Sequence, residues 1–253
     1  MKVAAFFVLF WDERVSEMYT YDTMLSGKTP LNSEAIAVGW RDEQEFFDWL
    51  ADTWDARTSQ ETLTRLSEII TGLGIRPGVR VLDVGCGTGV LFTLIRPIIG
   101  AGGQLIGLDI SGRMLRHAMN RGGADLCIQA DAGAPPLHDH AFDWIICNAV
   151  LPHFIDKAGV LCALRRCLAP DGTLVICHAN SRETINAIHR QAGGAVAQDR
   201  LPDPVTLAEM LRQAGLHPVQ SVEGADRYVV IARPYRMCDN RPTPGSGYES
   251  LTP

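Results

Sequence analysis

The sequence is short of basic residues. Its 253 residues include 23 Lys and Arg against 29 Asp and Glu, which gives a formal net charge of −6 at pH 7. Proteins that bind nucleic acids neutralise phosphate groups with clustered Lys and Arg side chains. Here the basic residues form only short pairs such as Arg165-Arg166. We therefore predict no nucleic-acid partner.

Paired cysteines are also lacking. The seven cysteines are odd in number, none belongs to a C-x-x-C pair, and most lie inside apolar runs. A disulfide framework or a zinc site needs cysteines at regular spacing. The sequence instead favours reduced, buried thiols, no bound metal and a cytoplasmic location.

A hydrophobic run of membrane-spanning length is missing from the N-terminal region. The apolar run from Val3 to Trp11 is far too short to cross a bilayer. The acidic pair Asp12-Glu13 follows it, where a signal peptide would carry small residues for cleavage. We expect an uncleaved segment without stable membrane insertion, whereas the oligomeric state is not defined by the sequence.

The hydrophobic content is sufficient for one sizeable globular domain. It reaches 46% of the 253 residues, and a second full domain is not expected. We divide the chain into an N-terminal segment with a helical lid (1–57), a main domain (58–233) and a disordered tail (234–253).

Two helices are expected ahead of the main domain's first strand. Apolar residues recur at three- and four-residue spacing from Glu43 to Asp55, which predicts an amphipathic helix; they are Phe46, Phe47, Leu50 and Trp54. Its aromatic face either pads the fold or covers a ligand pocket. The second helix is predicted to begin at Thr58, whose spacing to Glu61 suits a capping box, and to stop at Gly74.

The chain is organised around residues 79–91, which read VRVLDVGCGTGVL. An apolar run typical of a buried parallel strand leads into Gly85, Gly87 and Gly89 and then into a helical pattern. Glycine lets a ligand lie against the backbone, and amides at a helix N-terminus favour an acceptor or an anion. A dinucleotide loop needs a small residue where Val90 stands, so a pyrophosphate ligand fits poorly.

Alternating helices and strands follow this loop. Residues 90–99 are predicted as a helix that Pro97 should end or bend. The predicted strands are 104–108, 125–130, 144–148, 173–178, 216–222 and 227–232, with helices over 156–168 and 204–214.

An acidic residue, Asp109, stands at the end of the second predicted strand. A carboxylate at this position can accept hydrogen bonds from both hydroxyls of a ribose. The alternative, that Asp109 merely caps the next helix, is weakened because Ser111 is available for the cap.

Several motifs resemble those of the class I S-adenosylmethionine-dependent methyltransferases. The stretch from Asp83 to Gly89 resembles the family's first motif, an acidic residue followed by G-x-G-x-G, and residues 142–154 resemble its fourth. The leucine-bearing helix that precedes Ala169-Pro-Asp-Gly172 resembles a third region, with Asp171 in place of a glycine. The sequence looks most similar to the branch of the ubiquinone and menaquinone biosynthesis methyltransferases, without the segments that mark the quinone enzymes.

This resemblance implies an α/β fold, the doubly wound, Rossmann-like methyltransferase sheet. It implies seven mostly parallel strands in the order 3-2-1-4-5-7-6 and a helical N-terminal cover. It also implies S-adenosyl-L-methionine as cofactor, with Asp131 facing the adenine amino group. The cofactor-binding residues expected from the strand ends and motifs are Asp83, Gly85, Cys86, Gly87, Thr88, Gly89, Asp109, Ile110, Met114, Asp131, Ala132, Asn148 and Ala149.

Two histidines are candidates for a catalytic role. His153 and His178 follow strands whose carboxyl ends face the ligand crevice of an open α/β sheet. Imidazole titrates near neutrality, so either histidine can act as a base or orient the acceptor, or simply form the pocket wall. With Trp54 and His189, the same two histidines are also the expected acceptor-binding residues.

The predicted reaction is in-line methyl transfer to a small-molecule acceptor. A metalloid or thiol methyltransferase is one alternative, because Cys86, Cys147 and Cys177 fall near the ends of strands. A protein that binds the cofactor without turnover is the other. The identity of the acceptor is not encoded in any pattern that we can read.

Overall fold

The computed structural model describes residues 43–192 and 194–235 of the chain. Residues 1–42, predicted as an uncleaved N-terminal segment, lie outside the described residues. So do residues 236–253, which make up nearly all of the predicted tail.

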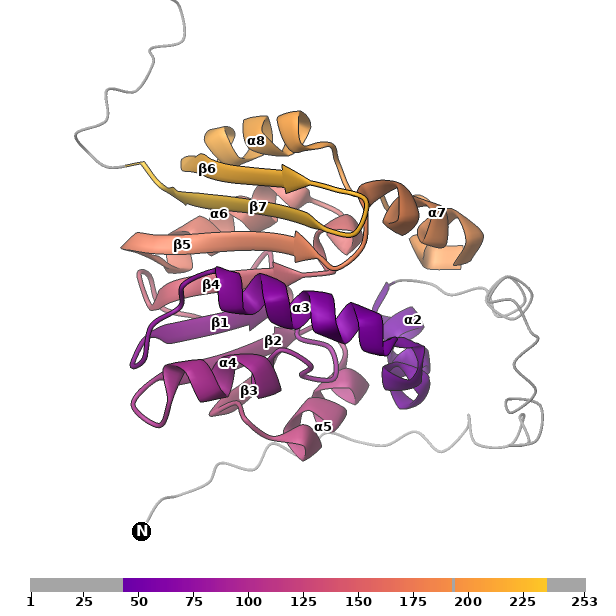
Figure 1. Cartoon of the computed structure of the whole chain (residues 1–253), viewed down its shortest axis with the longest axis horizontal. Helices are drawn as coiled ribbons and strands as arrows, with labels where there is room; N and C mark the ends of the chain where they lie inside the picture. The colour runs from indigo at the N-terminus through magenta and orange to yellow at the C-terminus, as the bar shows by residue number, and fades with distance from the viewer. Residues whose placement is uncertain (1–42, 193, 236–253) are drawn as a thin grey trace, which may run out of the picture.

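Seven strands form one sheet in the order β3-β2-β1-β4-β5-β7-β6 (Figure 1). β1 pairs in parallel with β2 and β4, whereas β7 is antiparallel to β5 and β6. This confirms both the predicted α/β class and the strand order expected from the resemblance. The strands are β1 Arg80–Val84, β2 Gln104–Asp109, β3 Leu126–Gln129, β4 Phe142–Asn148, β5 Leu168–His178, β6 Leu216–Glu223 and β7 Tyr228–Pro234.

Helices cover both faces of the sheet. α3, α4 and α5 pack on one face, and α6 and α8 pack on the other. α2 and α7 lie beyond the carboxyl ends of the parallel strands, at the right in Figure 1. The helices are α2 Glu43–Leu50, α3 Gln60–Gly72, α4 Phe92–Ile99, α5 Gly112–Arg121, α6 Lys157–Cys167, α7 Arg182–Ala192 and α8 Pro204–Gln213, with short 3₁₀ turns η3 Ala51–Thr53, η4 Asp55–Arg57, η5 Leu151–His153 and η6 Gly194–Val196.

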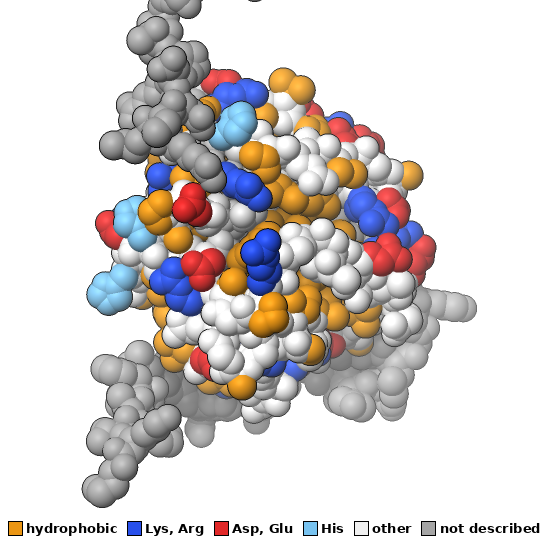
Figure 2. All heavy atoms as spheres, turned by 60° about the vertical axis from the view of Figure 1, so that its left-hand side comes forward, with side chains coloured by type: hydrophobic (Ala, Val, Ile, Leu, Met, Phe, Trp, Pro, Cys, Tyr) orange, Lys and Arg blue, Asp and Glu red, His pale blue; other side chains and the backbone are white. Residues whose placement is uncertain are grey.

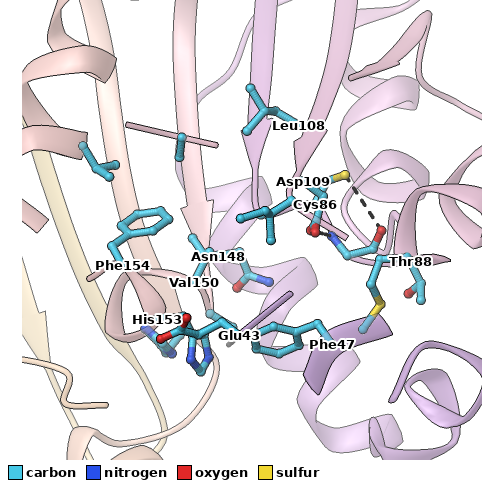
Figure 3. Close-up of a pocket in the computed structure, with 18 of the residues that line it drawn as sticks. Glu43, Phe47, Cys86, Thr88, Leu108, Asp109, Asn148, Val150, His153 and Phe154 are labelled. Atoms are coloured by element: carbon cyan, nitrogen blue, oxygen red, sulfur yellow. Dashed lines mark hydrogen bonds between the residues drawn. The ribbon is translucent and has the colours of Figure 1, made fainter. Parts of the chain in front are cut away.

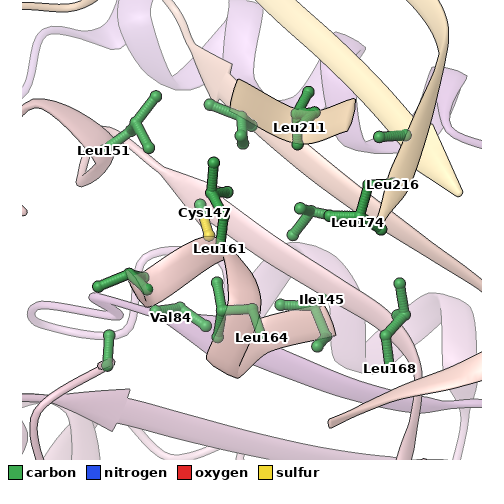
Figure 4. Close-up of a cluster of buried hydrophobic side chains, with 14 of the residues drawn as sticks. Val84, Ile145, Cys147, Leu151, Leu161, Leu164, Leu168, Leu174, Leu211 and Leu216 are labelled. Carbon is green, nitrogen blue, oxygen red and sulfur yellow. The ribbon is translucent and has the colours of Figure 1, made fainter. Parts of the chain in front are cut away.

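Successive strand residues supply two separate cores. In β1, Val81 packs toward α3 and α4, whereas Leu82 packs toward α6 and α8. Ile146 and Ile145 of β4 divide in the same way. Figure 4 shows the second core, in which leucines of α6, α8 and β5 meet side chains of β1 and β4. Because both faces are buried, successive residues in the middle of these strands are apolar rather than alternating with polar ones.

Two details of the helices differ from the sequence prediction. The N-cap of α3 is Ser59, not Thr58, since the Ser59 hydroxyl accepts the Thr62 amide at 3.1 Å. Thr58 still belongs to the preceding turn, because its amide donates to the Asp55 carbonyl. Pro97 does not end α4 but lies inside it, two positions before its last residue. The carbonyl that loses a partner belongs to an exposed residue, where water can replace the missing N–H.

Two strand boundaries also differ. β5 begins at Leu168 rather than Thr173, because Leu168 pairs with Phe142 across a register shift in β4. β7 runs to Pro234, one residue into the segment predicted as tail. Both strands therefore extend further than the apolar runs that predicted them.

The surface turned away from α2 and α7 carries mixed charge. In Figure 2, basic and acidic side chains lie among one another on this side of the molecule. In the part of the chain that the structure describes, no helix combines the length and the apolar character needed to cross a membrane.

Candidate functional site

The loop between β1 and α4 carries no side chain at three of its positions. Gly85, Gly87 and Gly89 all have positive φ, at +64°, +53° and +80°. A Cβ at Gly85 would stand 2.3 Å from Cγ2 of Val150, and one at Gly89 would stand 2.7 Å from the ring of Phe92. Conformation and close packing therefore both require glycine at these two positions.

Asp109 connects this loop to the start of α5. Its Oδ2 accepts the Gly87 amide and its Oδ1 accepts the Ser111 amide, each at 2.8 Å. Ser111 caps α5, because its hydroxyl accepts the Met114 amide at 3.0 Å. The helix therefore does not need the Asp109 side chain as its cap, and each carboxylate oxygen keeps a lone pair for a ligand.

Two buried carboxyl groups lie close together beneath the loop. Burial raises the pKa of Asp109, and the amides of Ser111 and Gly87 partly offset this. Burial and the nearby charge of Asp109 hold the pKa of Asp83 well above its usual range. Asp83 is 1% exposed, and its Oδ2 has no hydrogen-bond partner.

The segment from α2 to η4 is fastened over the loop by three carboxylates. Asp48 accepts from the Ser111 hydroxyl at 2.5 Å, and Asp55 accepts from the Thr88 hydroxyl at 2.6 Å. Asp52 pairs with two side chains of α5. Residues 43–57 therefore lie over this loop, and three of them, Glu43, Phe47 and Trp54, line the adjoining cavity; we refer to residues 43–57 as the cover.

A cavity of about 570 Å³ opens at the carboxyl ends of β1, β2, β4 and β5. Figure 3 shows Cys86, Thr88 and Asp109 on one side of it, with Phe47 and His153 next to each other on another. The cavity brings together most of the residues predicted for the site, namely Trp54, Gly85, Cys86, Gly87, Thr88, Asp109, Ile110, Met114, Asp131, Ala132, Asn148, Ala149, His153 and His178.

Three of the predicted residues do not line this cavity. Asp83 lies buried behind the glycine loop, and Gly89 packs against Phe92. His189 is 8% exposed and lies behind His153, with the two ring centroids 4.8 Å apart. Each can act on a ligand in the cavity only through the residues in front of it.

His153 has a partner that the sequence did not indicate. Its Nδ1 lies 2.5 Å from Oδ2 of Asp199, and both side chains are largely buried. The ring also stacks edge-on against Phe47 at 4.9 Å. From the sequence, Asp199 lies in a long polar loop that could be either the rim of a pocket or a plain connection. No spacing pattern links it to His153.

His178 ends β5 and faces the cavity, as predicted from its place at a strand end. It is 1% exposed, and neither ring nitrogen has a hydrogen-bond partner among the described residues. Burial lowers the pKa of His178 to about 3, with smaller contributions from His153 and His189. At neutral pH the ring is therefore uncharged, with one N–H to donate and one nitrogen to accept.

The cysteines do not favour metalloid or thiol chemistry. Cys147 and Cys177 are fully buried and do not line the cavity, and burial raises the pKa of Cys177 to about 12. Cys86 does line it, but burial and the carboxylates beside it hold its pKa well above the usual range. Among residues 43–192 and 194–235, no group of His, Cys, Asp or Glu is arranged to hold a metal ion.

The cavity suits the nucleoside ligand expected from the sequence. Asp109 is a buried acceptor at the tip of β2, and Asp131 supplies a second carboxylate after β3. On the other side of Asp109, after β1, lies a loop whose backbone is open because a Cβ at Gly87 would meet only Trp54, at 3.8 Å. Asp109 and Asp131 supply the acceptors that a ribose and an exocyclic amine require, and the open backbone leaves room for the rest of the ligand.

The sequence matches the methyltransferase-domain family over residues 82–176. It is 33% identical over 138 residues to an uncharacterized 37.1 kDa protein in a transposon of Streptomyces fradiae, covering 53% of this chain but only 38% of that relative. It is 29% identical to the ubiquinone/menaquinone biosynthesis C-methyltransferase of Shewanella piezotolerans, covering 66% and 78% of the two chains.

Solved structures share the fold. A SAM-dependent methyltransferase from Aquifex aeolicus superposes with a TM-score of 0.60 at 19% identity, over 73% of this chain and 97% of the other. The motifs, the strand order, the cavity and these matches agree with one another. The chain therefore carries a class I S-adenosylmethionine-dependent methyltransferase domain, similar to the ubiquinone/menaquinone biosynthesis enzymes, and its cofactor is S-adenosyl-L-methionine.

Proposed function

We propose that this protein transfers a methyl group from S-adenosylmethionine to a small-molecule acceptor by in-line displacement. The observation that carries the proposal is that a single cavity is lined both by the glycine loop with Asp109 and Asp131 and by His153 and His178. A cofactor held by the first set would lie within reach of an acceptor held by the second. Such proximity is the main requirement of methyl transfer.

Each residue of the first set has a defined task in this proposal. Asp109 accepts hydrogen bonds from the ribose hydroxyls, and Asp131 accepts from the adenine amino group. The amino-acid end lies against the glycine loop, where no side chain covers the backbone at Gly87, with Asn148 and Ala149 beside it. The cofactor, when bound, supplies a methyl group already activated by its sulfonium.

The charge of the protein supports a small molecule as the acceptor. The net charge is −6, and on the face shown in Figure 2 the basic side chains lie among acidic ones, which is unlike the clustered Lys and Arg that hold a phosphate backbone. The six cysteines of the described residues are unpaired, which supports a reducing compartment, and we infer that the protein acts in the cytoplasm.

Calorimetry with S-adenosylmethionine and S-adenosylhomocysteine tests the cofactor site. We expect micromolar binding to the unchanged protein and a loss of about 10- to 100-fold for Asp109→Ala, because hydrogen bonds to a charged group are worth about 1.5–3 kcal/mol. Asp139→Asn changes an exposed carboxylate on the α6 side and should leave binding unchanged. Equal binding by Asp109→Ala would contradict the assigned role.

A product screen separates turnover from binding alone. Acceptors with hydroxyl, amine, thiol and metalloid groups are incubated with the cofactor, and products are identified by mass. A methylated product supports the enzyme. Tight cofactor binding with no product from any acceptor class would instead favour the cofactor-binding protein that does not turn over.

A further inference from the structure

The charges that line the cavity restrict the acceptor. No Lys or Arg lines the cavity among the described residues, whereas four carboxylates do: Glu43, Asp109, Asp131 and Asp156. An anionic acceptor would meet negative charge without a compensating cation. The wall next to His153 is instead aromatic, with Phe47, Trp54 and Phe154.

The contact between His153 and Asp199 fixes the tautomer of the imidazole. A carboxylate 2.5 Å from Nδ1 can only accept, so Nδ1 carries the proton and donates. Nε2 then has a free lone pair, and it makes no hydrogen bond to the described residues. Because the ring lines the cavity and Phe47 and His189 flank it on two sides, the lone pair is available to a ligand.

Other charged groups near this pair are engaged elsewhere. Lys157 donates to the carbonyls of Pro152 and Phe154, at 2.9 and 2.8 Å, and so holds the turn that carries His153. Arg200 donates to two carbonyls of its own loop. Burial lowers the pKa of both His189, to about 4, and His178, so both rings are uncharged near neutral pH.

His153 also lies close to the glycine loop. Val150, three positions earlier, is the residue that a Cβ at Gly85 would strike. The 3₁₀ turn η5 carries the chain from Val150 to His153 at the same rim. A base at His153 is therefore near the position that the proposed function gives to the reacting methyl group.

We propose, on the basis of the proposed function, that the acceptor is an uncharged phenol, that His153 is its general base, and that Asp199 positions His153. The acceptor O–H proton passes to Nε2 of His153. The oxygen lone pair forms the new O–C bond as the C–S bonding pair of the sulfonium donor returns to sulfur. The products are a methyl ether, a thioether and an imidazolium that releases its proton to solvent.

A phenol fits an imidazole base better than an aliphatic alcohol does. A phenolic hydroxyl has a pKa of about 10, close enough to that of imidazole for proton transfer during the reaction. The uncharged His178, which lacks a partner, can donate to the same oxygen or to a second polar group of the acceptor. The aromatic wall accommodates the ring.

The first test compares acceptors that share a benzene ring and differ in the reacting group: phenol, aniline, thiophenol and benzoate derivatives. Products are identified by mass. We expect methylation of phenols alone. A faster reaction of any other class, or no reaction of phenols with protein that still binds S-adenosylhomocysteine, would overturn the assignment. Loss of S-adenosylhomocysteine binding would instead count against the proposed function.

The second test varies the acidity of the phenol. At a pH above the pKa of para-nitrophenol but below that of phenol, His153→Ala should lose about 100-fold or more in kcat with phenol. It should lose only a few-fold in kcat with para-nitrophenol, which is already ionised. The negative charge of the cavity should raise KM for this anion equally in both proteins, so the ratio of their kcat values is unaffected. Equal losses with both acceptors would show that His153 is structural.

Asp199→Asn tests the positioning role. The amide can donate to Nδ1 and reverse the tautomer, so we expect the same selective loss as for His153→Ala, with little change in KM. The double variant should be no worse than either single one, because the residues act as a unit. Retained S-adenosylhomocysteine affinity verifies folding, and His138→Ala, at an exposed histidine, should behave as the unchanged protein. Additive losses, or equal losses with both phenols, would overturn the role of Asp199.

Discussion

At Gly85 both the backbone conformation and the packing exclude a side chain. Its φ of +64° is costly for any residue with a Cβ, and the space that a Cβ would fill is taken by Val150. The positive φ lets the loop turn toward the cavity, and the contact with Val150 joins the turn after β4 to the turn after β1. One glycine therefore holds together the two segments that carry the proposed cofactor and acceptor residues.

We predict that Gly85→Ala destabilises the protein by about 2–5 kcal/mol. About 1–2 kcal/mol comes from the left-handed backbone and a further 1–3 from the clash with Val150. Gly74→Ala is the matched control, since Gly74 has a φ of +72° but nothing within 4 Å of its Cβ position. Urea denaturation measures both. Equal destabilisation of the two variants would show that the contact with Val150 relaxes at no cost.

Some residues of the site could be predicted from the sequence, and others could not. The glycines, Asp109 and Asp131 stand at fixed places relative to strands, so their position in the cavity followed from the pattern. Asp199 could not be found in this way. It is 46 positions from His153 in a segment without periodicity, and their contact depends on how η6 and its neighbours pack.

At the scale of elements, the cover depends on polar contacts as well as packing. Phe46 and Leu50 are buried in a small cluster with Met114 of α5. Arg121 of α5 pairs with Asp55, which also receives the Thr88 hydroxyl. The cover is thus tied to the first loop of the cofactor site, and its opening would break those contacts.

We predict that Asp55→Asn loosens the cover without unfolding the domain. The contacts of a largely exposed carboxylate are worth about 0.5–1.5 kcal/mol, so amides of residues 43–57 should exchange with deuterium about two- to tenfold faster. Asp139→Asn removes an ion pair of similar exposure, to Arg166 of α6, and should leave this exchange unchanged. Unaltered exchange in Asp55→Asn would show that packing alone holds the cover closed.

The predictability of the elements followed the strength of their patterns. The five parallel strands and the helices between them were visible as apolar runs separated by turn residues, and the strand order came from the family resemblance. The first and last residues of helices and strands were predicted less accurately. Ser59 rather than Thr58 caps α3 because of a turn that no propensity predicts, and β5 was extended by pairing with β4 across a register shift.

For the molecule as a whole, β5 is, like β1 and β4, a strand that supplies both cores. It lies between β4 and β7, and its residues contribute to the cores on both faces of the sheet. His178, its last residue, is opposite Tyr228 of β7, whose hydroxyl is also buried without a partner. Protonation of His178 in place would put an unpaired charge in the buried wall of the cavity, so it is coupled to unfolding of the whole domain.

The direction of the pH dependence follows from linkage. The folded state holds the pKa of His178 at about 3, below the value of about 6.5 for an unfolded histidine. The unfolded state therefore binds the proton first, and stability falls as pH drops below about 6.5. His189 acts in the same direction, whereas Asp83 and Asp109, whose pKa values are raised, act in the opposite one.

Because these contributions overlap, the test is the difference between two proteins. Between about pH 6 and pH 4, the free energy of unfolding of the unchanged protein should fall more steeply than that of His178→Leu. The expected difference is about 1.4 kcal/mol per pH unit, the value for one proton. His138→Leu, which alters an exposed histidine, should follow the unchanged protein. Parallel curves for His178→Leu would mean that His178 accepts its proton within the folded protein, and the cavity beside it would then have to admit water.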